Sequence, residues 1–227
     1  MLNFVDTVTQ SLWNGLVLSE TPVSLAKLKL VADATYARCD AKDGLKDGII
    51  DDPRRCDFDP ARDVAQCPAG QDGDNCLTPA QAASVKKVHE GLKVNGKPHL
   101  FGYPIGAEAT GLSFTAGGKM TSGWDVWLVP PPGGKSLQHG FGDSFVRYWA
   151  WPKTDASIDP AKFDFDKDMA KFADARVLLN ATDPDLSPFR SRGGKLLMYF
   201  GWADPQLNPQ IATVAKQVKA AAAAGKK

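Results

Sequence analysis

The run KLLMYFGWADP at residues 195–205 is the stretch of sequence that decides the fold class. Residues 195–200 form a short apolar run with glycine on both sides, a pattern typical of a fully buried parallel strand. Asp204 follows just beyond the carboxyl end of that strand, where α/β folds place their chemistry. The run therefore predicts an α/β protein in which one core strand is followed by a helix that begins near Pro209.

Upstream of this run, the sequence predicts helices separated by long loops. Apolar periodicity and capping residues predict one helix over residues 24–38, with Ser24 as N-cap, and a second over residues 78–92, opened by a threonine-proline pair. Residues 166–181 predict a third helix with acidic residues in its first turn. Residues 93–160 lack a lasting period and are rich in glycine and proline, so we expect a loop-dominated region there.

The cysteines indicate disulfides and not a zinc site. All of them lie within residues 39–76, and no CxxC pair of the kind that zinc sites usually contain is present. An even number of clustered cysteines favours two local disulfides and therefore export, either out of the cell or to a periplasm. Sequential pairing closes the shortest loops among the three possible connectivities. The cysteines are Cys39, Cys56, Cys67 and Cys76.

The segment CDAKDGLKDGIID at residues 39–51 is either a calcium-binding loop or a solvated acidic turn. Its carboxylates are separated by glycines that permit positive-φ turns, so the chain can curl round an ion and add carbonyl oxygens to the ligand set. The EF-hand spacing is absent, and Asp-Gly is also a common turn dipeptide, so spacing alone favours neither reading. The candidate ligands are the side chains of Asp40, Asp43 and Asp47 and the carbonyls of Leu45 and Ile49.

The charge balance argues against nucleic acid and membrane partners. The chain has 27 basic and 26 acidic residues, a net charge of +1 that provides no long-range field. No apolar run approaches the roughly 20 residues that a membrane span needs. These features favour a neutral small-molecule partner.

Tryptophans gather in the part of the chain that is expected to be loops. They either fill a local core or line an apolar pocket, and packing is the more common role of tryptophan. The residues of this group are Trp124, Trp127, Trp149 and Trp151.

The segment CDAKDGLKDGIIDDPRRCDFDP at residues 39–60 resembles the lid-domain signature of the tannase/feruloyl esterase family. The resemblance continues through CLTPAQ at residues 76–81. It resumes at residues 163–210 with FDFDKD, NATDPDLSPF and RGGKLLMYFGWADPQLNPQ. Several separate motifs thus occur in the order that is typical of this family.

The resemblance implies an α/β-hydrolase with a calcium-binding lid. Residues 1–190 would be this loop-rich α+β lid, and residues 191–227 would be a fragment of the α/β-hydrolase core. The aspartate loop would hold structural Ca²⁺ through the ligands named above. The cysteines would pair as Cys39–Cys56 and Cys67–Cys76, and Asp204 would be the acid of a Ser-His-Asp triad.

The resemblance also implies that the complete protein acts on a small aromatic ester of the feruloyl or galloyl type. Aromatic residues of the lid would line the pocket for the acyl group. Family members often carry histidine where this chain has Phe200, which puts polar recognition at that position in doubt. The candidate pocket residues are Phe200, Trp124, Trp127, Trp149 and Arg147.

Two members of the expected triad have no counterpart in the sequence. No Gly-x-Ser-x-Gly elbow precedes Asp204 and no histidine follows it, although α/β-hydrolases use that order. The segment GDSFV at residues 142–146 lacks the closing glycine and falls in the predicted loops. We expect His89, His99 and His139 to be packing or surface residues. The sequence thus predicts a fragment of a secreted serine esterase without useful activity of its own.

Two other hypotheses remain open from the sequence. One is a non-catalytic, calcium-stabilised module that binds aromatic ligands. The other is a degenerate remnant of a broken reading frame, which the Ala/Lys-rich tail favours. Residues 1–15 lack the basic segment and apolar core of a signal peptide, so export predicts that upstream sequence was removed or is missing. The sequon at Asn180 matters only in a eukaryotic secretory pathway.

Overall fold

Helices dominate the computed structural model, which describes residues 3–109, 112–114, 120–149, 158–181, 183, 185–197 and 199–208. The α-helices are α1 (Phe4–Glu20), α2 (Leu25–Cys39), α3 (Pro60–Asp63), α4 (Pro79–Glu90), α5 (Leu137–Tyr148), α6 (Phe165–Asp168), α7 (Ala173–Leu179) and α8 (Ser187–Ser191). The 3-10 helices are η1 (Asp40–Asp43), η2 (Pro53–Arg55), η3 (Pro160–Lys162) and η4 (Met169–Phe172). The strands are β1 (Lys93–Val94), β2 (Lys97–Pro98), β3 (Leu112–Phe114) and β4 (Met120–Ser122).

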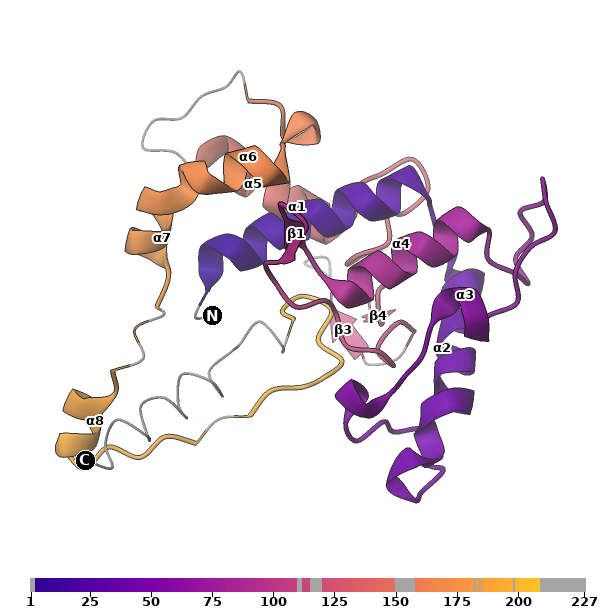
Figure 1. Ribbon diagram of the computed structural model, residues 1–227, viewed down its shortest axis with the longest axis horizontal. Coiled ribbons are helices and arrows are strands. Elements are labelled where there is room, and N and C mark those ends of the chain that lie inside the picture. Colours follow the sequence, from indigo (N-terminus) through magenta and orange to yellow (C-terminus); the bar gives the residue numbers. More distant parts are fainter. Residues whose placement is uncertain are drawn as a thin grey trace.

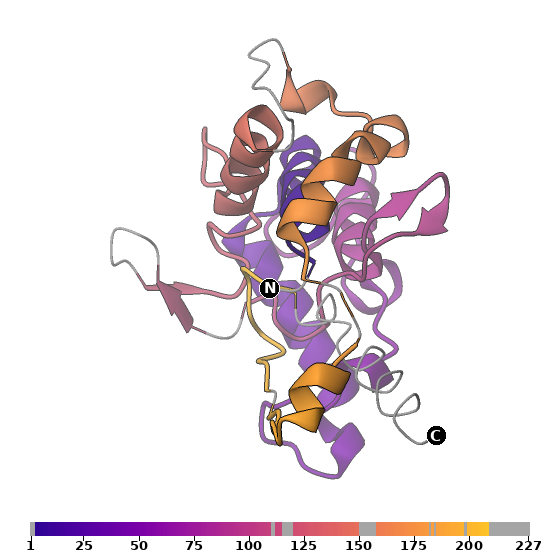
Figure 2. The same ribbon diagram turned by 90° about the vertical axis from the view of Figure 1, so that its left-hand side faces the viewer.

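The strands form two separate antiparallel hairpins, β1 with β2 and β3 with β4. Figure 2 shows the hairpins projecting on opposite sides of the helices. The described residues therefore build a helical body with two hairpins, and no sheet that spans it. None of the described helices has both the length and the apolar character that crossing a bilayer requires.

Helices α2 and α4 begin where the sequence predicts, because their N-caps are encoded locally. The Ser24 hydroxyl accepts a hydrogen bond from the Lys27 amide (3.3 Å) at the start of α2. At the start of α4, the Thr78 hydroxyl accepts from the Gln81 amide (3.2 Å), and the Gln81 side chain accepts from the Thr78 amide (3.0 Å). This reciprocal capping box confirms the predicted start of the second helix.

Helices α1 and α5 were not predicted, and they form the closest helix pair of the structure. A Cβ atom at Gly15 would collide with His139, and one at Gly142 would collide with the backbone of Leu12. The two glycines thus allow the helices to cross in close contact. Glycine also lowers helix propensity, which weakens the helical signal of residues 137–148. Residues 93–160 are dominated by loops as expected, with the exception of α5 and the short strands β1 to β4 among the described residues.

Two clusters of buried apolar side chains surround α1. One lies between α1, α2 and α4 and includes Leu28, Val85 and the fully buried Trp124. The other lies between α1, α5 and the segment that contains Phe172. Since α1 contributes Leu18 to the first cluster and Val5 and Leu12 to the second, it joins both parts of the body (Figure 1).

The third predicted helix, residues 166–181, is broken into three pieces. Helix α6 passes into the 3-10 turn η4, which passes into α7, and this last helix ends at Leu179. The turn η4 carries Met169 and Phe172 into the second apolar cluster. Tertiary packing of these side chains accounts for the departure from a continuous α-helix.

The predicted strand at residues 195–200 does not form. Residues 195–197, 199 and 200 have no strand pairing, and the side chains of Leu197 and Tyr199 are 90% and 93% exposed. A strand needs a neighbour to accept and donate its backbone hydrogen bonds, and no described residue supplies one. The prediction of a core strand was therefore wrong for this chain, while the helix expected near Pro209 lies outside the described residues.

The segment that follows α8 returns to the helical body. In Figure 1, α8 lies apart from α2 and α4, and the chain then runs back towards the centre in yellow. This return brings the residues just after Asp204, which is predicted to have a catalytic role, against the loop that follows β2.

Candidate functional site

Asp204 lies in a tight turn that its own side chain closes. Its Oδ1 accepts hydrogen bonds from the amides of Gln206 (2.8 Å) and Leu207 (2.9 Å). Pro205, which lies between donor and acceptor, limits the backbone freedom of this turn. The carboxyl group is therefore held by two neighbouring amides through one oxygen, and no described donor bonds to Oδ2.

The residues that follow Asp204 are fastened to the helical body. The Gln138 side chain donates from Nε2 to the Pro205 carbonyl (2.7 Å), and the Tyr103 hydroxyl donates to the Gln206 carbonyl (3.3 Å). The buried Asn208 donates to the carbonyl of Phe101 (2.7 Å) and to that of Gly102 (2.7 Å). These bonds connect residues that lie 67 to 107 positions apart in the chain, so tertiary structure fixes the turn.

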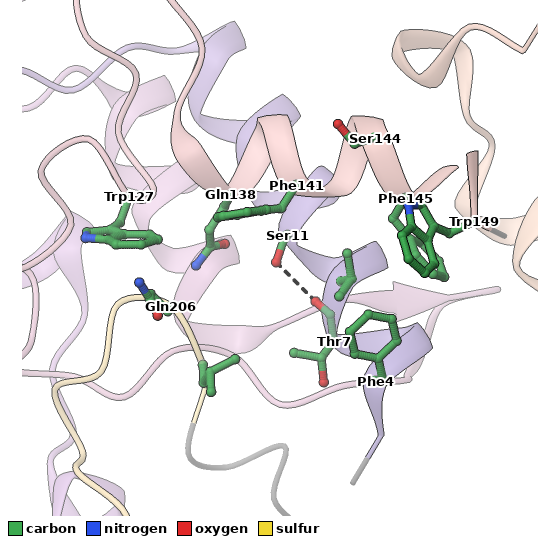
Figure 3. A pocket seen from close by; sticks show the side chains of 12 residues that line it. Phe4, Thr7, Ser11, Trp127, Gln138, Phe141, Ser144, Phe145, Trp149 and Gln206 are labelled. Carbon is green, nitrogen blue, oxygen red and sulfur yellow. Dashed lines mark hydrogen bonds between the residues drawn. The ribbon is translucent and has the colours of Figure 1, made fainter. Parts of the chain in front are cut away.

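A cavity of about 360 Å³ lies beside this turn, between α1 and α5. Figure 3 shows aromatic side chains from both helices around it, with Gln206 facing them from the returning segment. A mainly apolar cavity with a few polar groups is typical of a small-molecule site. The lining residues are Phe4, Thr7, Val8, Ser11, Trp127, Gln138, Phe141, Ser144, Phe145, Trp149, Gln206 and Leu207.

The structure brings two of the five candidate pocket residues to this cavity. Trp127 lines it and stacks on Phe141, with ring centroids 6.5 Å apart, and Trp149 lines it with 66% of its surface exposed. The other lining residues from α1 and α5 were missed. In α1 the spacing of Phe4, Val8 and Leu12 was a visible helical signal, whereas the contribution of Leu207 depends on the tertiary fold.

The remaining candidates lie elsewhere. Trp124 is fully buried in the core, where its ring lies 5.1 Å from that of His89. Arg147 forms an ion pair with Asp143 (2.7 Å), and Phe200 is 44% exposed and does not line the cavity. Trp151 lies outside the described residues.

The GDSFV segment is helical and is not a nucleophile elbow. Ser144 lies within α5, and Figure 3 shows its hydroxyl pointing away from Thr7 and Ser11. A nucleophile elbow is a strained turn between a strand and a helix, and an uninterrupted helix does not provide it. The expectation that this segment lies in a loop was wrong, but its exclusion as a nucleophile agrees with its place in the structure.

The histidines make contacts within the body, and no described histidine bonds to Asp204. His89 is buried, with Nε2 3.0 Å from the Glu108 carboxylate and Nδ1 2.9 Å from the Tyr103 carbonyl. His99 lies 3.3 Å from Asp6. His139 is buried at the crossing of α1 and α5, and burial lowers the pKa of its imidazole.

The cysteines form the predicted disulfides. Cys39 pairs with Cys56, with Cα atoms 5.5 Å apart, and Cys67 pairs with Cys76, with Cα atoms 4.9 Å apart. The first bond joins the end of α2 to the residue after η2, so it closes the aspartate loop at its base.

The aspartate loop curls through two positive-φ glycines, Gly44 (φ +101°) and Gly48 (φ +79°). Each candidate ligand carboxylate accepts one backbone amide. Asp40 accepts from Gly48 (3.0 Å), Asp43 from Leu45 (2.8 Å) and Asp47 from Ile49 (3.0 Å). No lysine or arginine in the described ranges pairs with any of the three.

The donor types of this loop fit calcium, which prefers carboxylate and carbonyl oxygen. Their arrangement does not form a closed coordination sphere. Among the described residues, no three acidic, histidine or cysteine side chains converge on one point.

Comparison with known proteins finds relatives along almost the whole chain. A model of the family described as tannase and feruloyl esterase matches residues 1–221. An uncharacterized esterase of Xanthomonas campestris is 33% identical over 202 residues, which cover 83% of this chain and 32% of that protein. Mono(2-hydroxyethyl) terephthalate hydrolase of Piscinibacter sakaiensis is 32% identical over 219 residues, which cover 84% of this chain and 36% of that protein. The chain thus spans about a third of the length of these curated relatives.

Solved structures show the same fold. Feruloyl esterase B from Aspergillus oryzae aligns with 99% of this chain and 41% of its own, with a TM-score of 0.75 and 24% identity. A tannin acyl hydrolase from Aspergillus niger aligns with 99% of this chain and 41% of its own, with a TM-score of 0.71 and 19% identity. The helical body and its hairpins therefore correspond to one part of these larger folds.

Proposed function

Because the chain belongs to the tannase and feruloyl esterase family, we propose that it supplies the triad acid and the acyl pocket of a serine carboxylic-ester hydrolase. The observation that carries this proposal is the juxtaposition of the closed turn at Asp204 with the aromatic cavity, which Gln206 and Leu207 help to line. The acid and the cavity wall belong to one short segment, so a substrate in the cavity would lie next to the acid.

Asp204 suits the role of triad acid because one oxygen is fixed and the other is available. Oδ1 accepts two amides, and this fixes the direction of the carboxyl group. Oδ2 would accept the Nδ1 proton of a histidine, hold that ring in its catalytic tautomer and stabilise the imidazolium that forms when serine loses its proton. Among the described residues, neither a histidine nor a serine bonds to Asp204, and we propose that these 227 residues alone do not turn over esters.

The cavity suits the acyl part of an aromatic ester. Trp127, Phe141 and Trp149 offer ring faces, and a volume of about 360 Å³ accommodates a single substituted ring. Relatives include a probable feruloyl esterase B-2 of Aspergillus terreus, 32% identical over 193 residues. We therefore propose esters of hydroxycinnamic, gallic or similar aromatic acids as the substrate class of the complete protein.

We also propose that residues 1–190 act as the lid of that protein, that residues 191–227 belong to its catalytic core, and that the aspartate loop binds structural Ca²⁺. This proposal is supported by the carboxylates of Asp40, Asp43 and Asp47, which form no ion pair with a described residue, and by the disulfide at the base of the loop. Disulfides are typical of exported proteins, so we propose an extracellular or periplasmic location.

A chimeric hydrolase tests the catalytic proposal. Residues 1–208 of this chain replace the matching segment of mono(2-hydroxyethyl) terephthalate hydrolase, which keeps the rest of its own sequence. We expect the purified chimera to cleave an aryl ester of ferulic or terephthalic acid, while residues 1–227 alone show no turnover. A chimera that folds, as judged by circular dichroism and a cooperative thermal transition, and yet lacks activity would contradict the proposal.

Thermal unfolding tests the calcium proposal on the purified, oxidised chain. Calcium at a hundredfold excess over its dissociation constant should stabilise the native state by about 2.7 kcal/mol, and EDTA should remove that gain. Asp43→Asn should abolish the shift. Asp33→Asn, which removes an exposed carboxylate on α2 paired with Lys29, should preserve it. No shift at millimolar calcium would leave the loop as an acidic turn.

A second candidate is a binding module without catalysis, favoured by a cavity whose described lining is mainly apolar and includes no histidine. This function predicts that the isolated chain binds free ferulic acid and that Trp127→Ala removes binding. Titration calorimetry of the chain and the activity of the chimera together separate the candidates. Binding of ferulic acid by the chain together with an inactive chimera supports the binding module. An active chimera supports the esterase.

A further inference from the structure

Gln138 is buried at the point where the Asp204 turn meets the helical body. It lies in the first turn of α5, and only 1% of its surface is exposed. Its Oε1 accepts from the Asn14 side chain of α1 (2.8 Å). Its Nε2 donates both to the Tyr103 hydroxyl and to the Pro205 carbonyl (2.7 Å). One amide thus connects α1, α5, the loop after β2 and the residue that follows Asp204.

Both ends of this amide are needed, because its partners are buried. Pro205 has no N–H, so its carbonyl is the only backbone group through which it can bond, and Gln138 is its described donor. A buried carbonyl that loses its donor bears the full cost of desolvation. A leucine of similar size at position 138 would therefore leave the Pro205 carbonyl and the Asn14 side chain without this partner.

Tyr103 extends the connection from Gln138 to the turn itself. Burial raises the pKa of Tyr103, and the Asp204 carboxylate adds to that rise, so the phenol stays protonated. The protonated hydroxyl accepts from Gln138 and donates to the Gln206 carbonyl. The hydrogen bonds therefore run in one direction, from Asn14 through Gln138 and Tyr103 to the turn, and bonds in such a chain strengthen one another.

We propose that Gln138 is a positioning residue, which holds the Asp204 turn in register with the aromatic cavity that Gln138 also lines. It touches the turn at Pro205 and the cavity wall at the same time. The importance of this positioning for catalysis rests on the proposed function. The positioning of the turn by Gln138 does not depend on that function. A measurement of the turn in the intact chain therefore tests the positioning even if the esterase proposal fails.

A second contact holds the other side of the turn, at the surface. The Arg54 guanidinium lies 5.3 Å from the ring centroid of Trp202, and it is itself oriented by the Asp52 carboxylate. Cation–π contacts at exposed sites are weak. We therefore expect the buried tether at Gln138 to dominate and Arg54→Ala to have a smaller effect on the turn.

Amide hydrogen exchange of the full 227-residue chain, read by NMR, tests this proposal. The reporters are the amides of Gln206 and Leu207, which the Asp204 carboxylate accepts. Gln138→Leu should speed their exchange about tenfold, the effect of one lost buried hydrogen bond, and leave the amides of α4 unchanged. Gln81→Leu is the matched control, since Gln81 is also a buried glutamine with side-chain hydrogen bonds but lies at the start of α4.

The control should reverse the pattern, with faster exchange in α4 and unchanged exchange at the Asp204 turn. Should Gln138→Leu fail to fold, Tyr103→Phe removes one hydroxyl and should speed exchange at the same two amides by a smaller factor. Unchanged exchange at Gln206 and Leu207 in the folded variants would overturn the proposal. Equal acceleration by the Gln81 control would also overturn it, because the effect would then be general loss of stability.

Discussion

The region around Trp124 and the segment that contains Leu197 differ in how their apolar residues are covered. Trp124 is fully buried between α1, α2 and α4, whereas Leu197 is 90% exposed although the run around it is just as apolar. The first region packs side chains that lie between Leu18 and Val129, the part of the chain that also forms its helices. The second is a run suited to a sheet that the described residues do not contain.

The two regions therefore obtain their stability from different sources. The helical body has caps, disulfides and a core of its own, so it should fold without further chain. The run at residues 195–200 needs neighbouring strands to satisfy its backbone and cover its side chains.

The largest effect is expected in the core of the helical body. Trp124→Ala removes a fully buried ring and should lower the free energy of unfolding by about 3–5 kcal/mol. Trp149→Ala, at a site that is 66% exposed, should change it by no more than about 0.5 kcal/mol. Urea unfolding followed by circular dichroism measures both. Equal losses would show that Trp124 is not the centre of an independent core.

The disulfide at the base of the aspartate loop should have the next largest effect. Replacing Cys39 and Cys56 by serine opens a loop with a sequence separation of 17 and should cost about 3 kcal/mol. The corresponding change at Cys67 and Cys76, with a separation of 9, should cost about 0.5 kcal/mol less. Chemical denaturation of the two double variants checks this order, and no loss in either would mean that the helices hold the body without them.

An ion pair between α1 and α7 should make the body sensitive to acid. Burial alone would raise the pKa of Asp6, but hydrogen bonds from His99 and Arg176 outweigh burial and lower it below the usual value near 3.8. The carboxylate therefore stabilises the fold above about pH 4, and this contribution disappears as the pH falls through the lowered pKa.

Asp6→Asn should cost about 1.5–3 kcal/mol at pH 7, the usual range for a hydrogen bond to a charged group. It should also flatten the loss of stability below pH 4. Thermal unfolding between pH 2 and 7 measures both effects. Asp33→Asn serves as control, because Asp33 pairs with Lys29 on the surface and should contribute little. An unchanged acid slope in Asp6→Asn would contradict the assignment.

The smallest effect on folding is expected in the exposed run. Leu197→Lys should change the free energy of unfolding by no more than about 0.5 kcal/mol, since this side chain has few contacts to lose. It should reduce self-association, which light scattering detects, because an exposed apolar run promotes pairing between chains. The variant Lys195→Leu, which adds an apolar residue, should increase self-association. Greater self-association of Leu197→Lys than of Lys195→Leu would mean that other residues cover the apolar run.

The sequence predicted those features that depend on neighbours in the chain. The starts of α2 and α4 follow from Ser24 and Thr78, whose side chains bond three residues ahead. The family resemblance supplied the disulfide pairing. The strand at residues 195–200 failed because its stability depends on a partner strand, which no local pattern can provide.

The site was harder to predict, because it is assembled from distant segments. Trp124 and Trp127 are three residues apart, yet one fills the core and the other lines the cavity. No local sequence pattern indicates the role of Gln138. Its role depends on hydrogen bonds with Asn14 and Pro205, which lie far from it in the chain. The pairing of α1 with α5 was hidden by the glycines that make their close crossing possible.

The proposed role of Asp204 as the acid of an ester hydrolase is tested most directly by the kcat of the chimeric hydrolase with Asp204→Asn. We predict a loss of about 10⁴-fold, because an amide holds the histidine in the wrong tautomer. Asp183→Asn, at an exposed aspartate that also closes a local turn, should leave kcat within about twofold. Full activity in the Asp204→Asn chimera would contradict the claim, because the acid would then have to lie elsewhere.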